Sequence, residues 1–591
     1  MILLFSVLLN FFQASVDTLT DKKIEKEIIQ LISENDNSAY LLEEIEFYHE
    51  NKIILKSASL KEIIKIPFLN ETDAKLIIQM RDSVELKNFS QLKGIYKNDK
   101  LKKLILQYCT KIELSNENKI KVRSRIVSPM IESNLKDRNL NESKIYEKIY
   151  FQFQNYSAHI LSFKNSSENY DLNNSYGFLT FENNILADKI VIGDFDVSGG
   201  EGLTFSKDSY NSISAGSISF NKTKNILNGH SSTSNKNFRG IGLELNLSKN
   251  ISFSPFYSVK SRNGIFDEYN KVVIIDSKSS DAKRMLEKSS GFILSNVIGK
   301  HKINFNFLNV KYSNIISANV PYNFESDKLK IIGFNGENNY SFGKIYFDIS
   351  KTNKNKKAYV VGFEADGNFI SYSLHLRKYE NGFMNPFANN YSQKSSIGGE
   401  EGIIFGIESQ VAENSKIIAI VDDYKLIEKD EFNIFGRDYI LKIESEFNEK
   451  ISGYFLFKQN QIKKNYRFHL DYIFNSNFDV SERIEFIETE TENGFLMFTD
   501  LNTDLIENKL NIILRAISFK TDSFNTRIYE FENDLPGNFG LNFLYGSGMK
   551  YYLLTDLKIN PNHKLYFKIS FLQKNQSVTA NQFGLQYDLI F

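Results

Sequence analysis

The sequence has no tryptophan, one cysteine and only seven prolines among its 591 residues. The single cysteine, Cys109, excludes an intramolecular disulfide and a cysteine-based metal cluster, and we expect it to be a buried small hydrophobe at the end of a helix. The formal net charge is zero, so no global field points to nucleic acid or to an anionic surface as a partner. No apolar run reaches the roughly 18 residues that a transmembrane helix needs, which excludes helical membrane spans. Low proline together with 50 Phe and 31 Tyr favours β-strands.

Catalytic motifs are also missing. The seven histidines are widely scattered, and no two have the spacing of a zinc site. There is no P-loop, no nucleophile elbow and no dinucleotide fingerprint. We therefore predict no catalytic residues, no metal ligands and no cofactor, and a protein that is not an enzyme.

The first residues form an apolar stretch, Ile2 to Phe12, followed by Gln13 and Ala14. This stretch is too short to cross a bilayer and has the length of a signal-peptide core. We predict a signal peptide over residues 1–16, with a buried N-terminal helix as the alternative.

The hydrophobic period then changes along the chain. From Thr20 to about Glu113, apolar residues recur three or four apart, which predicts a helical domain over residues 17–115. Residues 116–145 are expected to be a linker. From Tyr146 onward the period is two, which is typical of strands about 9–11 residues long with one apolar face.

The β-region, residues 146–591, contains strand after strand with no helical interlude. Turns are expected at 248–250, 366–368 and 475–477, and longer loops at the outer rim over 223–238 and 351–357. A soluble sandwich would show the same alternation, but a barrel with a polar lumen and roughly 16–22 strands absorbs this length better. The predicted fold is thus mainly β, a large antiparallel transmembrane barrel preceded by a small all-α domain.

One charged stretch of the β-region has two interpretations. Glu482, Arg483, Glu485, Glu488, Glu490 and Glu492 could line the lumen or form a charged outer loop. We favour the outer loop.

The final strand is the most specific feature of the β-region. Apolar residues alternate with Gly584, Gln586 and Asp588, and the last residue is aromatic. Such an ending resembles the signal by which bacterial outer-membrane barrels are recognised by their insertion machinery. The residues of this predicted insertion signal are Phe583, Leu585, Tyr587, Leu589 and Phe591.

The helical region resembles two helix-hairpin-helix units. Residues 57–70 resemble the opening of the first unit, which ends in its hairpin, and residues 72–81 resemble its second helix. Residues 89–96 and 101–105 resemble the second unit. In nucleic-acid-binding members, a glycine-rich hairpin presents backbone N–H groups to a phosphate. Here bulky side chains replace most of those glycines and hinder close approach. The candidate hairpin contacts are Phe68, Leu69, Asn70, Lys93, Gly94 and Ile95.

Beyond this region, the whole chain resembles an uncharacterised family of Bacteroidota-type bacteria that combines a signal peptide, a helix-hairpin-helix domain and an outer-membrane barrel. The matching stretches are the Pro67-Phe68-Leu69 hairpin, residues 191–195 with 199–205, and residues 546–552. The resemblance implies architecture and location, but no reaction and no substrate. We expect the glycines of these stretches to serve strand bends and tight turns.

These features together predict a non-enzymatic protein of the bacterial outer membrane with its N-terminal domain in the periplasm. That domain would plug the barrel or bind an envelope partner. The expected partners are outer-membrane lipid, the barrel-insertion machinery and a periplasmic protein. The alternative is a DNA-binding or DNA-uptake protein that uses the helix-hairpin-helix domain, which the hairpin side chains disfavour.

Overall fold

The computed structural model describes residues 71–82, shorter stretches between residues 53 and 110, and most of residues 119–591. The larger gaps in the last part are 131–141, 167–174, 207–212, 222–225, 231–236, 276–281, 319–323 and 428–432. The fold that follows is that of these described residues.

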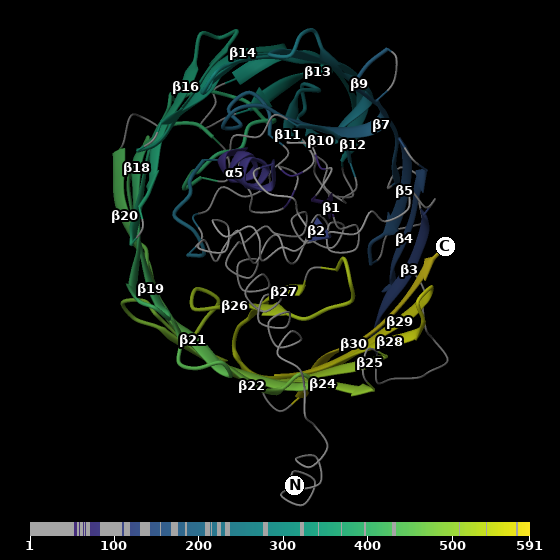
Figure 1. Cartoon of the computed structure of the whole chain (residues 1–591), viewed down its shortest axis with the longest axis vertical. Coiled ribbons are helices and arrows are strands. Elements are labelled where there is room, and N and C mark those ends of the chain that lie inside the picture. Colours follow the sequence, from purple (N-terminus) through teal and green to yellow (C-terminus); the bar gives the residue numbers. More distant parts are fainter. Residues whose placement is uncertain are drawn as a thin grey trace, which may run out of the picture.

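An antiparallel sheet closes on itself to form a barrel (Figure 1). Counted over the described residues, 24 strands form its wall. They are β3 (Lys119–Met130), β4 (Lys144–Phe153), β5 (Tyr156–Lys164), β6 (Ser175–Glu182), β7 (Lys189–Ser198), β9 (Phe238–Asn246), β10 (Ile251–Phe266), β12 (Lys283–Ile298), β13 (His301–Ala318), β14 (Phe324–Tyr340), β15 (Gly343–Thr352), β16 (Lys357–Asp366), β17 (Ile370–Tyr379), β18 (Glu400–Ala412), β19 (Ser415–Ile427), β20 (Asn433–Glu446), β21 (Ile451–Gln459), β22 (Lys464–Asn475), β23 (Phe478–Glu488), β24 (Asn493–Ile506), β25 (Leu510–Thr521), β28 (Ser547–Asn560), β29 (His563–Lys574) and β30 (Ser577–Ile590). Two short strands, β8 (Ile226–Gly229) and β11 (Val272–Ile275), pair beside β7 and β10.

The first and last wall strands, β3 and β30, close the ring by antiparallel pairing. At the end of this seam, the Ile120 N–H donates to the Phe591 carbonyl at 3.1 Å, and the Phe591 N–H donates back at 2.8 Å. Successive wall strands are neighbours around the ring, so connections alternate between its two ends. The start of β3 and the end of β30 therefore lie at the same mouth of the barrel.

The wall differs from the prediction in strand number, strand length and starting point. It has 24 strands in place of roughly 16–22, because the sheet already begins at Lys119, inside the expected linker 116–145, and most turns on one side are short. Strands β10, β12, β13 and β14 have 16 to 18 residues, longer than the predicted span. The predicted turns at 248–250, 366–368 and 475–477 each join two wall strands.

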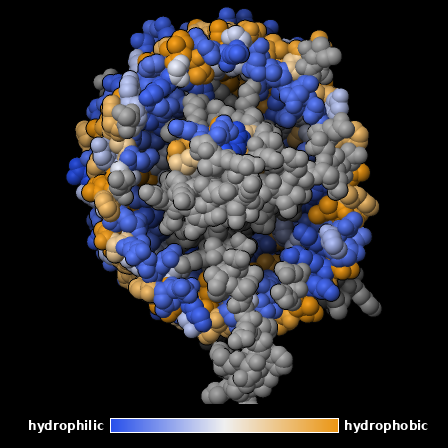
Figure 2. All heavy atoms as spheres, in the orientation of Figure 1, coloured by the Kyte–Doolittle hydropathy of each residue, from blue (hydrophilic) through white to orange (hydrophobic). Residues whose placement is uncertain are grey.

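The two faces of the wall carry different side chains. Outward positions are apolar and exposed, for example Tyr257, Phe405 and Ile484. The next residue along a strand points inward and is often polar, as Ser258 and Arg483 do. Figure 2 shows the same division, with apolar residues along the outer circumference and hydrophilic residues toward the bore.

The described part of the N-terminal region contains α5 (Glu71–Asp82) and a parallel pair of short strands, β1 (Ile53–Ile54) and β2 (Cys109–Thr110). Helix α5 matches the predicted second helix of the first helix-hairpin-helix unit, and its Ala74 and Ile77 are buried. Cys109 is buried as expected, but it lies in β2 and not at the end of a helix. One helix does not show a helix-hairpin-helix domain, and most of residues 17–115 lie outside the described ranges, so that domain stays a prediction. No helix among the described residues is long and apolar enough to cross a membrane.

Candidate functional site

Three connections at one mouth of the barrel carry buried residues and contact the inner wall. They span residues 199–237 between β7 and β9, residues 380–399 between β17 and β18, and residues 522–546 between β25 and β28. Because connections alternate between the two ends, all three belong to the mouth opposite Lys119 and Phe591. The candidate functional site is the inner wall together with these segments.

The first two segments bind each other and the wall. Asn385 Nδ2 donates to the carbonyls of Leu203 and Thr204 at 2.7 and 2.8 Å. On the wall strand β15, Asp348 accepts from the Leu203 N–H at 3.2 Å, and the hydroxyl of Ser350 lies 2.8 Å from that of Thr204. These contacts hold a tight turn of the chain against the inside of the barrel.

Glycine makes this turn possible. Gly200 and Gly202 have φ values of +62° and +86°, a conformation that favours glycine. A Cβ on Gly202 would lie 2.5 Å from the Asn389 carbonyl oxygen. The predicted role of this glycine-rich stretch in a tight turn is therefore confirmed.

The third segment, residues 522–546, is anchored by an apolar contact. It contains a hairpin of β26 (Ile528–Glu532) and β27 (Gly540–Leu544), drawn inside the ring in Figure 1. Ile528 and Leu544 join one buried cluster with inward residues of β24 and β25, among them Phe498 and Phe519. Burial of these side chains fixes the hairpin against one arc of the wall.

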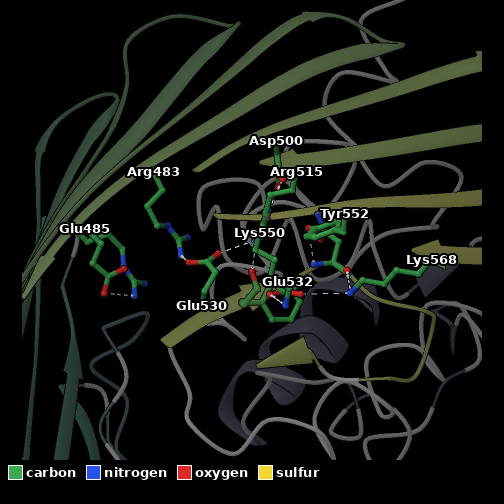
Figure 3. Close-up of polar contacts among 12 residues, drawn as sticks. Arg483, Glu485, Asp500, Arg515, Glu530, Glu532, Lys550, Tyr552 and Lys568 are labelled. Carbon is green, nitrogen blue, oxygen red and sulfur yellow. Dashed lines mark hydrogen bonds and ion pairs between the residues drawn. The ribbon is translucent and has the colours of Figure 1, made fainter. Parts of the chain in front are cut away.

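Ion pairs continue this contact (Figure 3). Glu530 accepts from Arg483 of β23 at 3.2 Å and from Arg515 of β25 at 2.8 Å. Glu532 pairs with Lys550 of β28. All of these side chains are buried or nearly so. Buried charges are tolerated where each has a close partner of opposite sign, which is the arrangement found here.

The turn that joins β26 to β27 is held in the same way. Lys568 of β29 lies 3.7 Å from Glu532 and 3.3 Å from Asp534, and it donates to the Asn533 carbonyl at 2.8 Å. The Pro536 carbonyl accepts from both Arg123 and Arg125 of β3, at 3.0 and 3.1 Å. The segment thus reaches from β23 to the closing seam of the barrel.

Some inward charges are paired within the wall itself. Arg467 and Glu485 form a two-bond pair across β22 and β23, with distances of 2.7 and 3.1 Å. Arg123 and Asp588 do the same across β3 and β30, at 2.8 and 2.7 Å. Such pairs link neighbouring strands and need no contribution from the segments.

The structure describes only some of the predicted site residues. The hairpin contacts Phe68, Leu69, Asn70, Lys93, Gly94 and Ile95 lie outside the described residues, so DNA binding stays a prediction. Phe583, Leu585, Tyr587 and Leu589 lie on the face of β30 opposite the buried Gln586 and Asp588, and Phe591 follows the strand. Their alternation is as predicted, whereas recognition by insertion machinery stays a prediction.

The charged outer loop predicted over residues 482–492 is wrong in part. Arg483 and Glu485 are inward residues of a wall strand, because residues 478–488 continue the two-residue period as β23. Only the turn at 489–492 has the expected position at the rim.

Sequence reasoning missed the segment 522–546 and its basic partners. One pattern could have indicated it: Glu530, Glu532 and Asp534 are spaced two apart and so share one face of an extended chain. Lys550 and Tyr552, in the stretch 546–552 singled out above, face the segment from the wall. Among the described residues, no group of three His, Cys, Asp or Glu side chains could hold a metal ion.

No protein-family model and no curated protein matches the chain. Solved structures with a similar course of the chain include the siderophore receptor PirA from Pseudomonas aeruginosa, at 7% identity and a TM-score of 0.41, covering 81% of this chain and 80% of that one. The FrpB iron transporter from Neisseria meningitidis is 8% identical with a TM-score of 0.39, covering 81% and 82%. The translocation pore of the P pilus usher PapC is 7% identical with a TM-score of 0.35, covering 80% and 99%. At these values the likeness carries no inference about ligand or partner.

Proposed function

We propose that the chain is a non-enzymatic barrel of the bacterial outer membrane whose bore is closed by its own segments. The observation that carries this proposal is the closed ring with exposed apolar side chains outside and charged side chains inside. Outside a membrane, an apolar surface of this extent would be unusual for a soluble protein. In a bilayer the same surface contacts lipid, and closure leaves no unpaired strand edge.

The proposal includes an orientation. Barrels of this class have short turns on the periplasmic side and longer loops outside. The mouth that holds Lys119 and Phe591 has the short turns, so it would face the periplasm, and segments 199–237, 380–399 and 522–546 would enter the bore from outside. The predicted periplasmic domain is consistent with this orientation.

The N-terminal region would act as a plug. Seen along the barrel axis, α5 projects inside the ring of strands (Figure 1), which favours the plug over a domain docked beside the barrel. Binding of an envelope protein remains the alternative use of the same region.

Fractionation and gel mobility test the location. After expression in a bacterial host with an outer membrane, the chain should sediment with outer membranes and resist alkaline extraction. It should also migrate differently before and after boiling, as intact barrels do. Recovery in the soluble periplasm with no heat-dependent shift would overturn the proposal.

A further inference from the structure

One arc of the inner wall is rich in positive charge. We use "basic arc" for four inward side chains from strands that lie close together in the ring, namely Arg483, Arg515, Lys550 and Lys568 (Figure 3). Each is at most about one-eighth exposed at its side chain. The alternation of the strands fixes all four toward the bore.

The wall supplies little negative charge to this arc. Arg515 has one wall carboxylate, Asp500. For Arg483, Lys550 and Lys568, every carboxylate that forms an ion pair with them among the described residues comes from the segment 522–546. Removing the segment would therefore leave Lys550 and Lys568 without an acidic partner, and Arg483 with only Glu485 of its own strand, which already pairs with Arg467.

The hydrogen bonds of Arg483 also indicate that this wall could bind an anion. Its Nη1 donates to Glu530 and its Nη2 donates to Tyr454, but its buried Nε has no hydrogen-bond partner in the structure. A guanidinium pairs best with a planar anion that takes two parallel N–H bonds. The single bond to Glu530 leaves part of that capacity unused.

The segment places its carboxylates against the basic arc, as a bound anion would place its oxygens. Glu530 and Glu532 lie on β26 and Asp534 lies in the turn that joins it to β27, and each pairs with a member of the arc. Fixed cations in a narrow aqueous bore attract mobile anions and exclude cations. The same wall would bind an anion from solution once the segment moves away.

We propose that the basic arc is an anion-binding surface of the bore and that the segment 522–546 occupies it as an internal anion. Its ligands are solutes with carboxylate or phosphate groups, since these share the geometry of the glutamates that they replace. The inference rests on the proposed function, because an anion reaches the arc only through a bore that spans the membrane.

Two matched variants of the full chain test the proposal in planar bilayers. E530Q/E532Q/D534N removes the segment's side of these ion pairs and leaves the basic arc intact. R483Q/K550Q/K568Q removes the wall's side of all of them except Arg515–Glu530. In a potassium chloride gradient, the first variant should conduct with at least a several-fold preference for chloride. The second should conduct with no such preference. Inorganic phosphate should reduce the current of the first variant only.

Trypsin gives a second readout on the wild-type chain in lipid vesicles. Arg527 lies within the segment, so cleavage after it reports displacement of the segment. Phosphate at equal ionic strength should accelerate this cleavage several-fold over chloride. In R483Q/K550Q/K568Q, the rate of cleavage should be the same in phosphate and in chloride.

Several outcomes would overturn the proposal. These are a cation-selective E530Q/E532Q/D534N variant, equal selectivity of the two variants, or no effect of phosphate on cleavage. If the N-terminal plug keeps the variant silent, the cleavage readout decides. Each variant is first checked for outer-membrane location and heat-dependent mobility. Failure there counts against the proposed function, whereas failure after it counts against the anion site alone.

Discussion

Glu530 links two strands of the wall through one carboxylate. It accepts from Arg483 and Arg515 while it is 0% exposed, and it belongs to the segment and not to the wall. Breaking a buried pair at one partner costs about 3–5 kcal/mol, because the remaining charge loses its counter-charge without regaining water. The side chain should therefore control how firmly the segment is docked.

We expect E530Q to weaken the docking of segment 522–546 on the wall by about 3 kcal/mol. The fraction of molecules with the segment displaced then rises roughly a hundredfold. Limited trypsin digestion, with cleavage after Arg527 as the readout, measures this change. E490Q, in the turn between β23 and β24, is the matched control and should digest like the wild type. Equal digestion of all three proteins would contradict the assignment.

Gly202 permits a second test at this scale. The residue has φ +86°, and an added Cβ would meet the Asn389 carbonyl oxygen at 2.5 Å and Ser206 Cβ at 2.9 Å. Gly299 has a similar φ of +61° but nothing within 4 Å of its Cβ position. The pair separates backbone strain from steric conflict.

We expect G299A to cost about 1 kcal/mol and G202A about 2–4 kcal/mol, since only the second adds a clash to the cost of the left-handed conformation. The temperature at which heat-dependent gel mobility is lost measures both. Similar losses in the two variants would show that residues 199–206 do not pack tightly in the bore.

At the scale of strands, the outward face determines where the barrel can reside. Phe405 lies near the middle of β18 and is 45% exposed, whereas Ile462 lies in the turn between β21 and β22 and is 72% exposed. Both are apolar and accessible. In a membrane their surroundings would differ, with hydrocarbon around the first and the interface or water around the second.

F405K should therefore cost about 2–4 kcal/mol in folding into lipid vesicles, and I462K close to none. Denaturant titration of vesicle-inserted protein gives both values. If the two lysine variants were equally stable, the outward face would not be in hydrocarbon.

The sequence predicted a strand wherever one face of that strand is uniformly apolar. The β30 alternation and the turn at 248–250 follow directly from the two-residue period. Strand β3 escaped detection because its outward positions include Ser124 and Ser128 and its inward ones are Arg123 and Arg125, so neither face is uniformly apolar. The inward course of the long connections could not be predicted, because it depends on contacts such as that of Leu203 with Asp348, which are distant in sequence.

At the scale of the whole molecule, the zero net charge has a structural counterpart. Acidic side chains of the segment 522–546 lie against basic side chains of the wall, so charges of both signs cancel inside the bore. Composition revealed the balance but not this pairing, which depends on how the segment folds against β23, β25, β28 and β29.

Lipid should surround the outward face of the barrel and should not reach the inward face. Because the chain has no native tryptophan, one introduced indole reports alone. F405W places it on the outward face of β18. F498W places it on the inward face of β24, beside Arg515.

Fluorescence quenching by acyl-chain-brominated lipid is then the most direct measurement. In vesicles of this lipid, F405W should be strongly quenched and F498W hardly at all. Equal quenching of the two variants, or no quenching of F405W, would contradict the account.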